Sequence, residues 1–178
     1  SGWRLDVADE LPDDFIAGLN AAAKQEKPDA LVIGEVWEDA SNKVAYNIRR
    51  KYFTEGELDS VMNYPLRDGL VAFLTGRSTA HALADLLLSQ RLNYPRPLYY
   101  ALMNLTASHD VARTRSALAL DFDPRSRTRA ELAALEITDA MAARGAQLQV
   151  LAAAVQFWLP GIPSIYYGDE AGMQGLCD

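Results

Sequence analysis

The sequence contains almost none of the residues that build metal sites and disulfides. Its 178 residues include one cysteine, Cys177, and two histidines, His81 and His109. A lone cysteine cannot form an internal disulfide. One thiol and two imidazoles also exclude a multi-cysteine zinc site and a histidine-rich metal centre. We therefore expect no metal of these kinds and no cofactor, and the sequence leaves calcium binding open.

Excess positive charge and long apolar runs are also missing. The chain has 17 basic and 24 acidic residues, a net charge of −7, which argues against nucleic acid or an anionic membrane as a partner. No apolar stretch approaches the ~18 residues of a membrane span, and no signal peptide is visible. With 49% hydrophobic and 23% charged residues, the composition is that of an ordinary globular protein. We expect a soluble, cytoplasmic protein.

What the sequence does contain is an alternation of two apolar patterns. Short, nearly continuous apolar runs predict strands, and apolar residues at three- and four-residue spacing predict helices. Strands that alternate with helices predict an α/β fold with a parallel sheet and right-handed crossovers. The predicted strands are 3–8, 30–37, 58–65, 100–108 and 163–170; the predicted helices are 11–26, 66–75, 79–91, one begun by the Thr128–Glu131 capping box, and 145–159 before Pro160.

Both ends of this pattern are strands. The chain begins on a strand without a preceding helix and stops shortly after the last predicted strand without a closing helix. An open parallel sheet of this kind exposes unpaired strand edges, which favour association. We therefore expect residues 1–178 to be a single-domain fragment of a larger (β/α) protein that self-associates through its exposed strand edges.

Three carboxylates occupy comparable places near predicted strand ends. Asp6 lies inside the first strand near its C-terminal end, Glu35 ends the second, and Asp110 follows the fourth. In a parallel β/α barrel the C-terminal strand ends form the active site, and neighbouring strands lie about 4.8 Å apart. Asp6 and Glu35 are therefore expected within the ~5–5.5 Å that separates the carboxyl groups of a retaining glycosidase.

Such a pair needs two different environments, because one carboxyl group must be ionised and the other protonated. Arg4, two residues before Asp6, projects from the same face of the strand. Its guanidinium is expected to hold Asp6 ionised and oriented. Glu35 is expected among apolar neighbours such as Val36 and Trp37.

The spacing alone leaves alternatives open. Arg4 and Asp6 also fit a structural salt bridge, and Glu35 also fits a solvated loop residue or a helix cap. His109 and Asp110 fit a helix N-cap with a polar neighbour. Metal-assisted lyase or isomerase chemistry on the same barrel competes equally with glycoside hydrolysis.

The sequence motifs around these residues resemble conserved regions of a known family. "GWRLDVADE", "VIGEVW" and "NLTASHD", in this order, resemble the second, third and fourth conserved regions of the α-amylase family of retaining glycoside hydrolases. "LDSVMNYPLRDGL" and "LPGIPSIYYGDEAGMQG" resemble stretches typical of its neopullulanase, cyclomaltodextrinase and maltogenic amylase branch. The resemblance implies a partial (β/α)8 TIM barrel that consists of strands four to eight with their helices.

The resemblance also implies a role for each matching residue. Asp6 corresponds to the nucleophile, Glu35 to the general acid and base, and Asp110 to the third carboxylate, which binds sugar hydroxyls. Arg4 corresponds to the arginine that orients the nucleophile, and His109 to the histidine that hydrogen-bonds the sugar.

Trp37 has no single implied role, and two further positions differ from the residues usual in the branch. Trp37 fits a sugar-stacking platform and equally a hydrophobic lid residue. Glu38 stands where the branch often has His, and Ala107 where Gly is usual, so the resemblance leaves substrate preference open. Asp169, like its neighbour Glu170, is expected to be structural.

The resemblance therefore implies hydrolysis of α-1,4-glucosidic bonds with retention, in cyclomaltodextrin, pullulan or starch oligosaccharides. A transglycosylase or isomerase of the same family is the alternative, because sugar can replace water as the acceptor. A non-catalytic folding or assembly fragment is the alternative from another class, and we expect the isolated chain to be inactive.

Overall fold

The computed structural model describes residues 1–176, and these fall into two compact units. The first consists of Ser1–Pro65, Leu87–Met103 and Pro160–Ile162, and the second of Leu66–Leu86, Asn104–Leu159 and the chain from Pro163 onward. The single domain expected over residues 1–178 stays a prediction. Cys177 lies outside the described residues.

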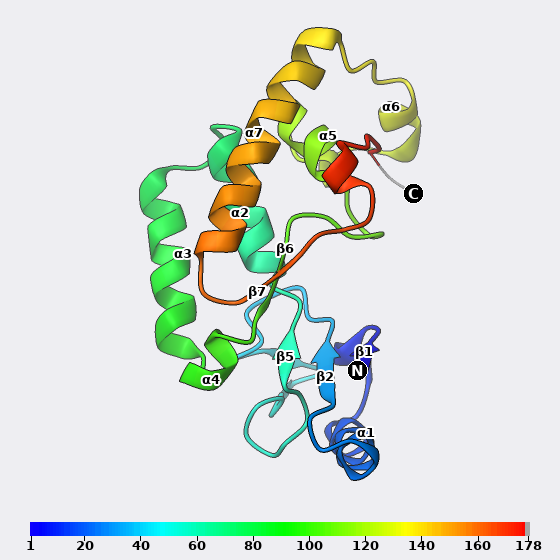
Figure 1. Ribbon diagram of the computed structural model, residues 1–178, viewed down its shortest axis with the longest axis vertical. Helices are drawn as coiled ribbons and strands as arrows, with labels where there is room; N and C mark the ends of the chain where they lie inside the picture. Colours follow the sequence, from blue (N-terminus) through cyan, green and yellow to red (C-terminus); the bar gives the residue numbers. More distant parts are fainter. Residues whose placement is uncertain (177–178) are drawn as a thin grey trace. The chain divides into compact units, whose positions relative to one another are not determined.

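The first unit contains a parallel sheet in the order β1-β2-β5 (Figure 1). Strand β1 (Gly2–Leu5) pairs with β2 (Leu31–Gly34), and β2 pairs with β5 (Ser60–Val61). A parallel bridge from Met62 to Met103 extends the pairing beyond β5. The parallel arrangement is the one predicted, although each strand is shorter than its apolar run.

One helix and a single apolar core support this sheet. Helix α1 (Asp13–Glu26) has Pro12 at its N-cap and the acidic Asp13 and Asp14 in its first turn, where the helix dipole favours negative charge. It follows the short 3₁₀ helix η1 (Ala8–Glu10). The buried core of this unit is formed by Leu5, Ala8, Ile16, Val32, Val36, Ala40, Tyr52, Leu58, Val61, Tyr94 and Leu102.

A hairpin that the sequence did not predict lies between β2 and β5. Strand β3 (Val44–Ala45) pairs antiparallel with β4 (Ile48–Arg49). The two loop residues, Tyr46 and Asn47, both have a positive φ, 53° and 61°. This is the backbone of a type I′ turn, whose twist matches that of the paired strands.

Helix α4 (Arg96–Tyr99) belongs to the first unit, whereas α2 (Tyr64–Leu74), α3 (Ala80–Asn93), β6 (Met103–Leu105) and β7 (Ile162–Ser164) each contain residues of both units. Strands β6 and β7 form a two-stranded sheet. Strand β6 lies inside the predicted run 100–108, whereas β7 begins one residue before the predicted run 163–170 and ends at Ser164.

The second unit is mainly helical. It contains α5 (Thr114–Ala119), η2 (Pro124–Ser126), α6 (Arg129–Ala133), α7 (Asp139–Trp158) and η3 (Asp169–Ala171). The predicted capping box is confirmed: Thr128 and Glu131 bond each other's backbone N–H at the start of α6. The buried core of the second unit consists of Leu70, Val71, Ala112, Ala117, Leu118 and Ala152. Within residues 1–176, no helix is long and apolar enough to cross a membrane.

Helices α5 and α7 pack closely, and they lie side by side in Figure 1. A Cβ atom added to Gly145 of α7 would lie 2.4 Å from the backbone oxygen of Arg115 and 3.1 Å from the Cβ of Ala119. Because backbone cannot move aside cheaply, we expect Gly145→Ala to destabilise the full-length protein by about 1–3 kcal/mol in denaturant unfolding.

The matched control is Gly18→Ala in α1, where an added Cβ meets nothing within 4 Å. Alanine favours the helix there, so the free energy of unfolding should rise by up to about 1 kcal/mol. Unfolding midpoints that move together in the two variants would contradict the close α5–α7 packing.

Candidate active site

Asp6 and Glu35 follow directly after two neighbouring parallel strands. The register pairs Leu5, the last residue of β1, with Gly34, the last residue of β2. The pairing continues one step further, because the N–H of Glu35 donates to the carbonyl of Leu5 at 3.0 Å and the N–H of Ala8 donates to the carbonyl of Glu35 at 3.1 Å. Asp6 therefore lies just beyond β1, not inside it as predicted, since a turn begins at that residue.

The Arg4 guanidinium contacts both carboxylates. Its Nη1 forms an ion pair and a hydrogen bond with Oδ1 of Asp6. Its Nη2 lies 3.0 Å from Oε2 of Glu35, an ion pair without hydrogen-bond alignment. The contact with Asp6 was predicted from the two-residue spacing along the strand, and the contact with Glu35 was not.

The two carboxylates have different environments. The side chain of Glu35 is 4% exposed, whereas that of Asp6 is 71% exposed. The backbone N–H of Val7 donates to Oε2 of Glu35 at 2.8 Å. Val7 has φ 40° and ψ 56°, the left-handed region, which costs a β-branched residue on the order of 1–3 kcal/mol. The amide that fixes Glu35 therefore comes from a strained turn.

Trp37 lies two residues beyond Glu35 and packs on an aromatic neighbour. Its ring stacks on that of Tyr64 with centroids 4.0 Å apart and an interplanar angle of 9°. One face of the indole is thus covered by protein. The half-buried side chain leaves only its other face for a ligand.

His109 and Asp110 belong to the second unit. They follow β6 and lie next to each other, with Nε2 of His109 3.2 Å from Oδ2 of Asp110. The N–H of Asp110 donates to the hydroxyl of Ser108 at 3.1 Å, which fixes the turn. The structure thus brings Arg4, Asp6 and Glu35 into contact in the first unit, where Trp37 follows Glu35 by two residues, and it brings His109 and Asp110 into contact in the second.

A segment with three arginines, residues 123–129, lies next to His109 and Asp110. A cavity of about 300 Å³ is lined by these two residues together with Arg125, Arg127 and Arg129. The sequence analysis did not single out these arginines, although "DPRSRTR" carries three of them within seven residues.

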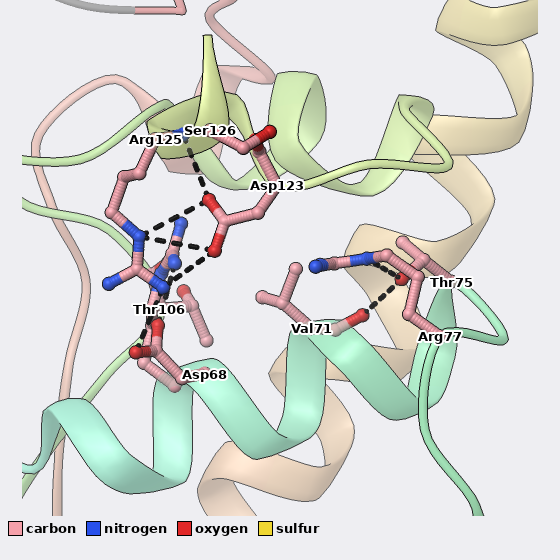
Figure 2. A network of polar contacts seen from close by, with 9 residues as sticks. Asp68, Val71, Thr75, Arg77, Thr106, Asp123, Arg125 and Ser126 are labelled. Carbon is pink, nitrogen blue, oxygen red and sulfur yellow. Dashed lines mark hydrogen bonds and ion pairs between the residues drawn. The ribbon is translucent and has the colours of Figure 1, made fainter.

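Arg125 is held in place by two carboxylates (Figure 2). Its Nη2 lies 2.7 Å from Oδ2 of Asp123 and 3.0 Å from Oδ2 of Asp68 on α2. The hydrogen bonds donated by Arg125 lower the pKa of Asp123. Two carboxylates thus fix the orientation of the Arg125 guanidinium.

Buried polar contacts fix the end of β6. The hydroxyl of Thr114 contacts the hydroxyl of Thr106 at 2.9 Å and donates to Oδ2 of Asp169 at 2.6 Å. Burial raises the pKa of Asp169, which lies 3.9 Å from the Arg113 guanidinium. These contacts give Asp169 a structural role.

Among residues 1–176, no group of three or more His, Cys, Asp or Glu side chains is placed to hold a metal ion.

The site in the first unit can support acid, base and nucleophilic chemistry. It offers an exposed carboxylate beside a buried one, and one cation contacts both. Sequence reasoning missed the Val7 amide, because Val7 lies in an apolar run that resembles a strand and no pattern marks its positive φ.

Residues 1–177 match the family model described as the α-amylase catalytic domain. The chain is 35% identical to an amylopullulanase from Thermoanaerobacter thermohydrosulfuricus, 34% to a cyclomaltodextrinase from Thermoanaerobacter pseudethanolicus and 33% to neopullulanase 2 from Thermoactinomyces vulgaris. These alignments cover 98%, 99% and 99% of the chain. The chain spans 11%, 25% and 25% of the lengths of the three relatives.

The fold of the chain is also similar to that of a solved hydrolase structure. The chain resembles the cyclic α-maltosyl-(1→6)-maltose hydrolase from Arthrobacter globiformis in complex with its cyclic substrate, with a TM-score of 0.76 and 26% identity. The match covers 99% of the chain and 33% of that protein.

The lowered pKa of Asp123 predicts how stability depends on pH. A carboxylate with a lowered pKa stabilises the fold above its unfolded pKa of ~3.9, and this contribution is lost as the pH falls through the folded pKa. We expect Asp123→Asn to cost about 1 kcal/mol at neutral pH and to lose this effect in acid. Denaturant unfolding across a pH series measures both. The exposed Asp121→Asn is the control, and a loss that is the same at every pH would contradict the assignment.

Proposed function

The chain belongs to the α-amylase catalytic-domain family, and on that premise we propose that it carries catalytic residues of a retaining α-glucan hydrolase. The family fold is a TIM barrel, as the resemblance implies, and the described residues form an α/β part of it. The order of the motifs supports the finer proposal that these strands are the fourth to eighth of the barrel. The single observation that carries the function is the Asp6–Glu35 pair on one guanidinium at adjacent parallel strand ends.

In this proposal Asp6 and Glu35 divide the reaction in two steps. The exposed carboxylate of Asp6 attacks the anomeric carbon, while Glu35 gives its proton to the departing glycosidic oxygen. A glycosyl ester on Asp6 and an ionised Glu35 result. Glu35 then takes a proton from water, the water oxygen bonds the anomeric carbon, and the ester bond breaks. Two inversions at one carbon retain its configuration.

The shared guanidinium keeps the two carboxylates near each other. Oδ1 of Asp6 contacts Nη1 and Oε2 of Glu35 contacts Nη2 of the same arginine. Retaining pairs lie ~5–5.5 Å apart and inverting pairs ~6.5–9.5 Å apart, to leave room for a water between the carboxyl groups, so the anomer of the first product decides between the two mechanisms.

Arg4 has a further role in the proposed cycle, because the negative charge moves between its two partners. In the free enzyme Asp6 is ionised, and in the covalent intermediate Asp6 is a neutral ester while Glu35 is ionised. A cation that contacts both residues stabilises whichever one carries the charge, without rearrangement of the site.

The remaining residues are proposed to bind the sugar. Asp110 accepts hydrogen bonds from sugar hydroxyls, and His109, adjacent to it, donates one. Trp37 offers the indole face that is not stacked on Tyr64. The names of the relatives support α-1,4-linked glucans as the substrate class, in the form of cyclomaltodextrin, pullulan or starch oligosaccharides.

Substitution of either central carboxylate tests the proposal. In the full-length protein, Glu35→Gln removes the transferable proton, so hydrolysis of cyclomaltodextrin should fall by about 10²–10⁴-fold. Asp6→Asn should abolish hydrolysis, because the amide does not form the ester intermediate. Release of reducing ends measures both rates, and proton NMR of the first product should show the α anomer.

The matched control is Glu26→Gln, an exposed carboxylate at the end of α1. Its rate should equal that of the unsubstituted protein. Near-normal turnover by Glu35→Gln, or a β-anomeric first product, would refute the assignment.

A further inference from the structure

The turn that follows Asp6 determines where the Val7 amide points. It spans Val7–Leu11, and within it the N–H of Glu10 donates to the carbonyl of Val7 at 2.9 Å and the N–H of Leu11 donates to the carbonyl of Ala8 at 3.3 Å. A residue in a strained conformation persists only where its surroundings fix it. The strain at Val7 therefore raises the question of what fixes this turn.

Arg50, which follows β4 of the hairpin, supplies the outside contacts. Its side chain is 6% exposed. Nη1 donates to the carbonyl of Asp9 at 2.7 Å, and Nη2 donates to the carbonyls of Ala8, at 3.4 Å, and Leu11. Three carbonyls of one short turn thus accept from a single guanidinium that comes from a different part of the chain.

The guanidinium is itself fixed by charge and by packing. Nε of Arg50 donates to Oδ1 of Asp13 at 2.7 Å, which compensates the buried charge. The guanidinium carbon of Arg50 lies over the ring of Tyr52, 4.9 Å from the ring centroid. The Tyr52 hydroxyl donates to the carboxylate of Asp9. Tyr52 is 1% exposed, and burial raises its pKa, so the hydroxyl keeps its proton.

We propose that Arg50 is a positioning residue for Glu35: it fixes the Val7–Leu11 turn and thereby keeps the Val7 N–H on Oε2 of Glu35. This inference rests on the proposed function, in which Glu35 is the acid. A planar fork with five donors meets several carbonyls and a carboxylate at once, whereas a lysine ammonium cannot. Loss of Arg50 therefore misplaces the acid more than it affects the exposed nucleophile.

Two substrates separate positioning of the acid from general damage. An α-glucosyl or α-maltosyl fluoride needs little protonation of its leaving group, whereas cyclomaltodextrin needs full assistance from the acid. In the full-length protein we expect Arg50→Ala to lower kcat/KM for cyclomaltodextrin by about 10²-fold and for the fluoride by less than about 5-fold. Arg50→Lys should lie between Arg50→Ala and the unsubstituted protein for cyclomaltodextrin.

The control is Arg49→Ala, one residue earlier on the exposed side of the same hairpin, which should leave both values unchanged. The ratio of the two kcat/KM values does not depend on the folded fraction, so it remains informative if Arg50→Ala folds poorly. An equal fold-loss on both substrates in Arg50→Ala and Arg50→Lys would overturn the positioning role. If the unsubstituted protein cleaves neither substrate, the proposed function itself fails.

Discussion

The contact of one guanidinium with two carboxylates is the interaction on which the candidate active site depends. Two carboxylates placed side by side repel each other, and each would disfavour ionisation of the other. The in-register parallel pairing of β1 and β2 brings Asp6 and Glu35 to the same sheet edge. Arg4, in β1 two residues before Asp6, contacts both. A shift of the pairing by one residue would turn one of these side chains to the other face of the sheet and separate the pair.

In each of the two units, the candidate carboxylates follow directly on or shortly after strands, and buried polar groups hold the neighbouring turns. In the first unit, Arg50 and Tyr52 contact the turn that contains Val7. In the second, Ser108 holds the backbone of Asp110, and Thr114 links the end of β6 to Asp169. Such arrangements cost stability, because charges are buried and Val7 is strained, and they fix side chains more precisely than an apolar core would.

The sequence predicts the elements whose signals are local. The apolar runs locate β1, β2 and β5, which pair in parallel, and they overlap β6 and β7; the capping box of α6 is present as predicted. The two-residue spacing of Arg4 and Asp6 also predicts their contact. The hairpin was missed because its strands have two residues each, and Tyr46–Asn47 was the only local sign of its turn. Arg50 was missed for another reason: its partners lie 37 to 42 residues away, so no window of sequence contains the interaction.

The hairpin segment links the two strand ends a second time. Lys43 lies 2.9 Å from Oδ2 of Asp9, three residues beyond Asp6, and also pairs with Glu38, three residues beyond Glu35. Glu38 is one of the two positions, with Ala107, at which the sequence departs from the pattern of the branch it resembles, and its side chain has a partner within the same segment. Changes at Glu38, Lys43 and Asp9 cannot act independently, because residues in one ion-pair network couple energetically. The surroundings of the Asp6–Glu35 pair are therefore set jointly by the barrel strands, which bring the carboxylates together, and by the segment between β2 and β5, which fixes the turns that follow them.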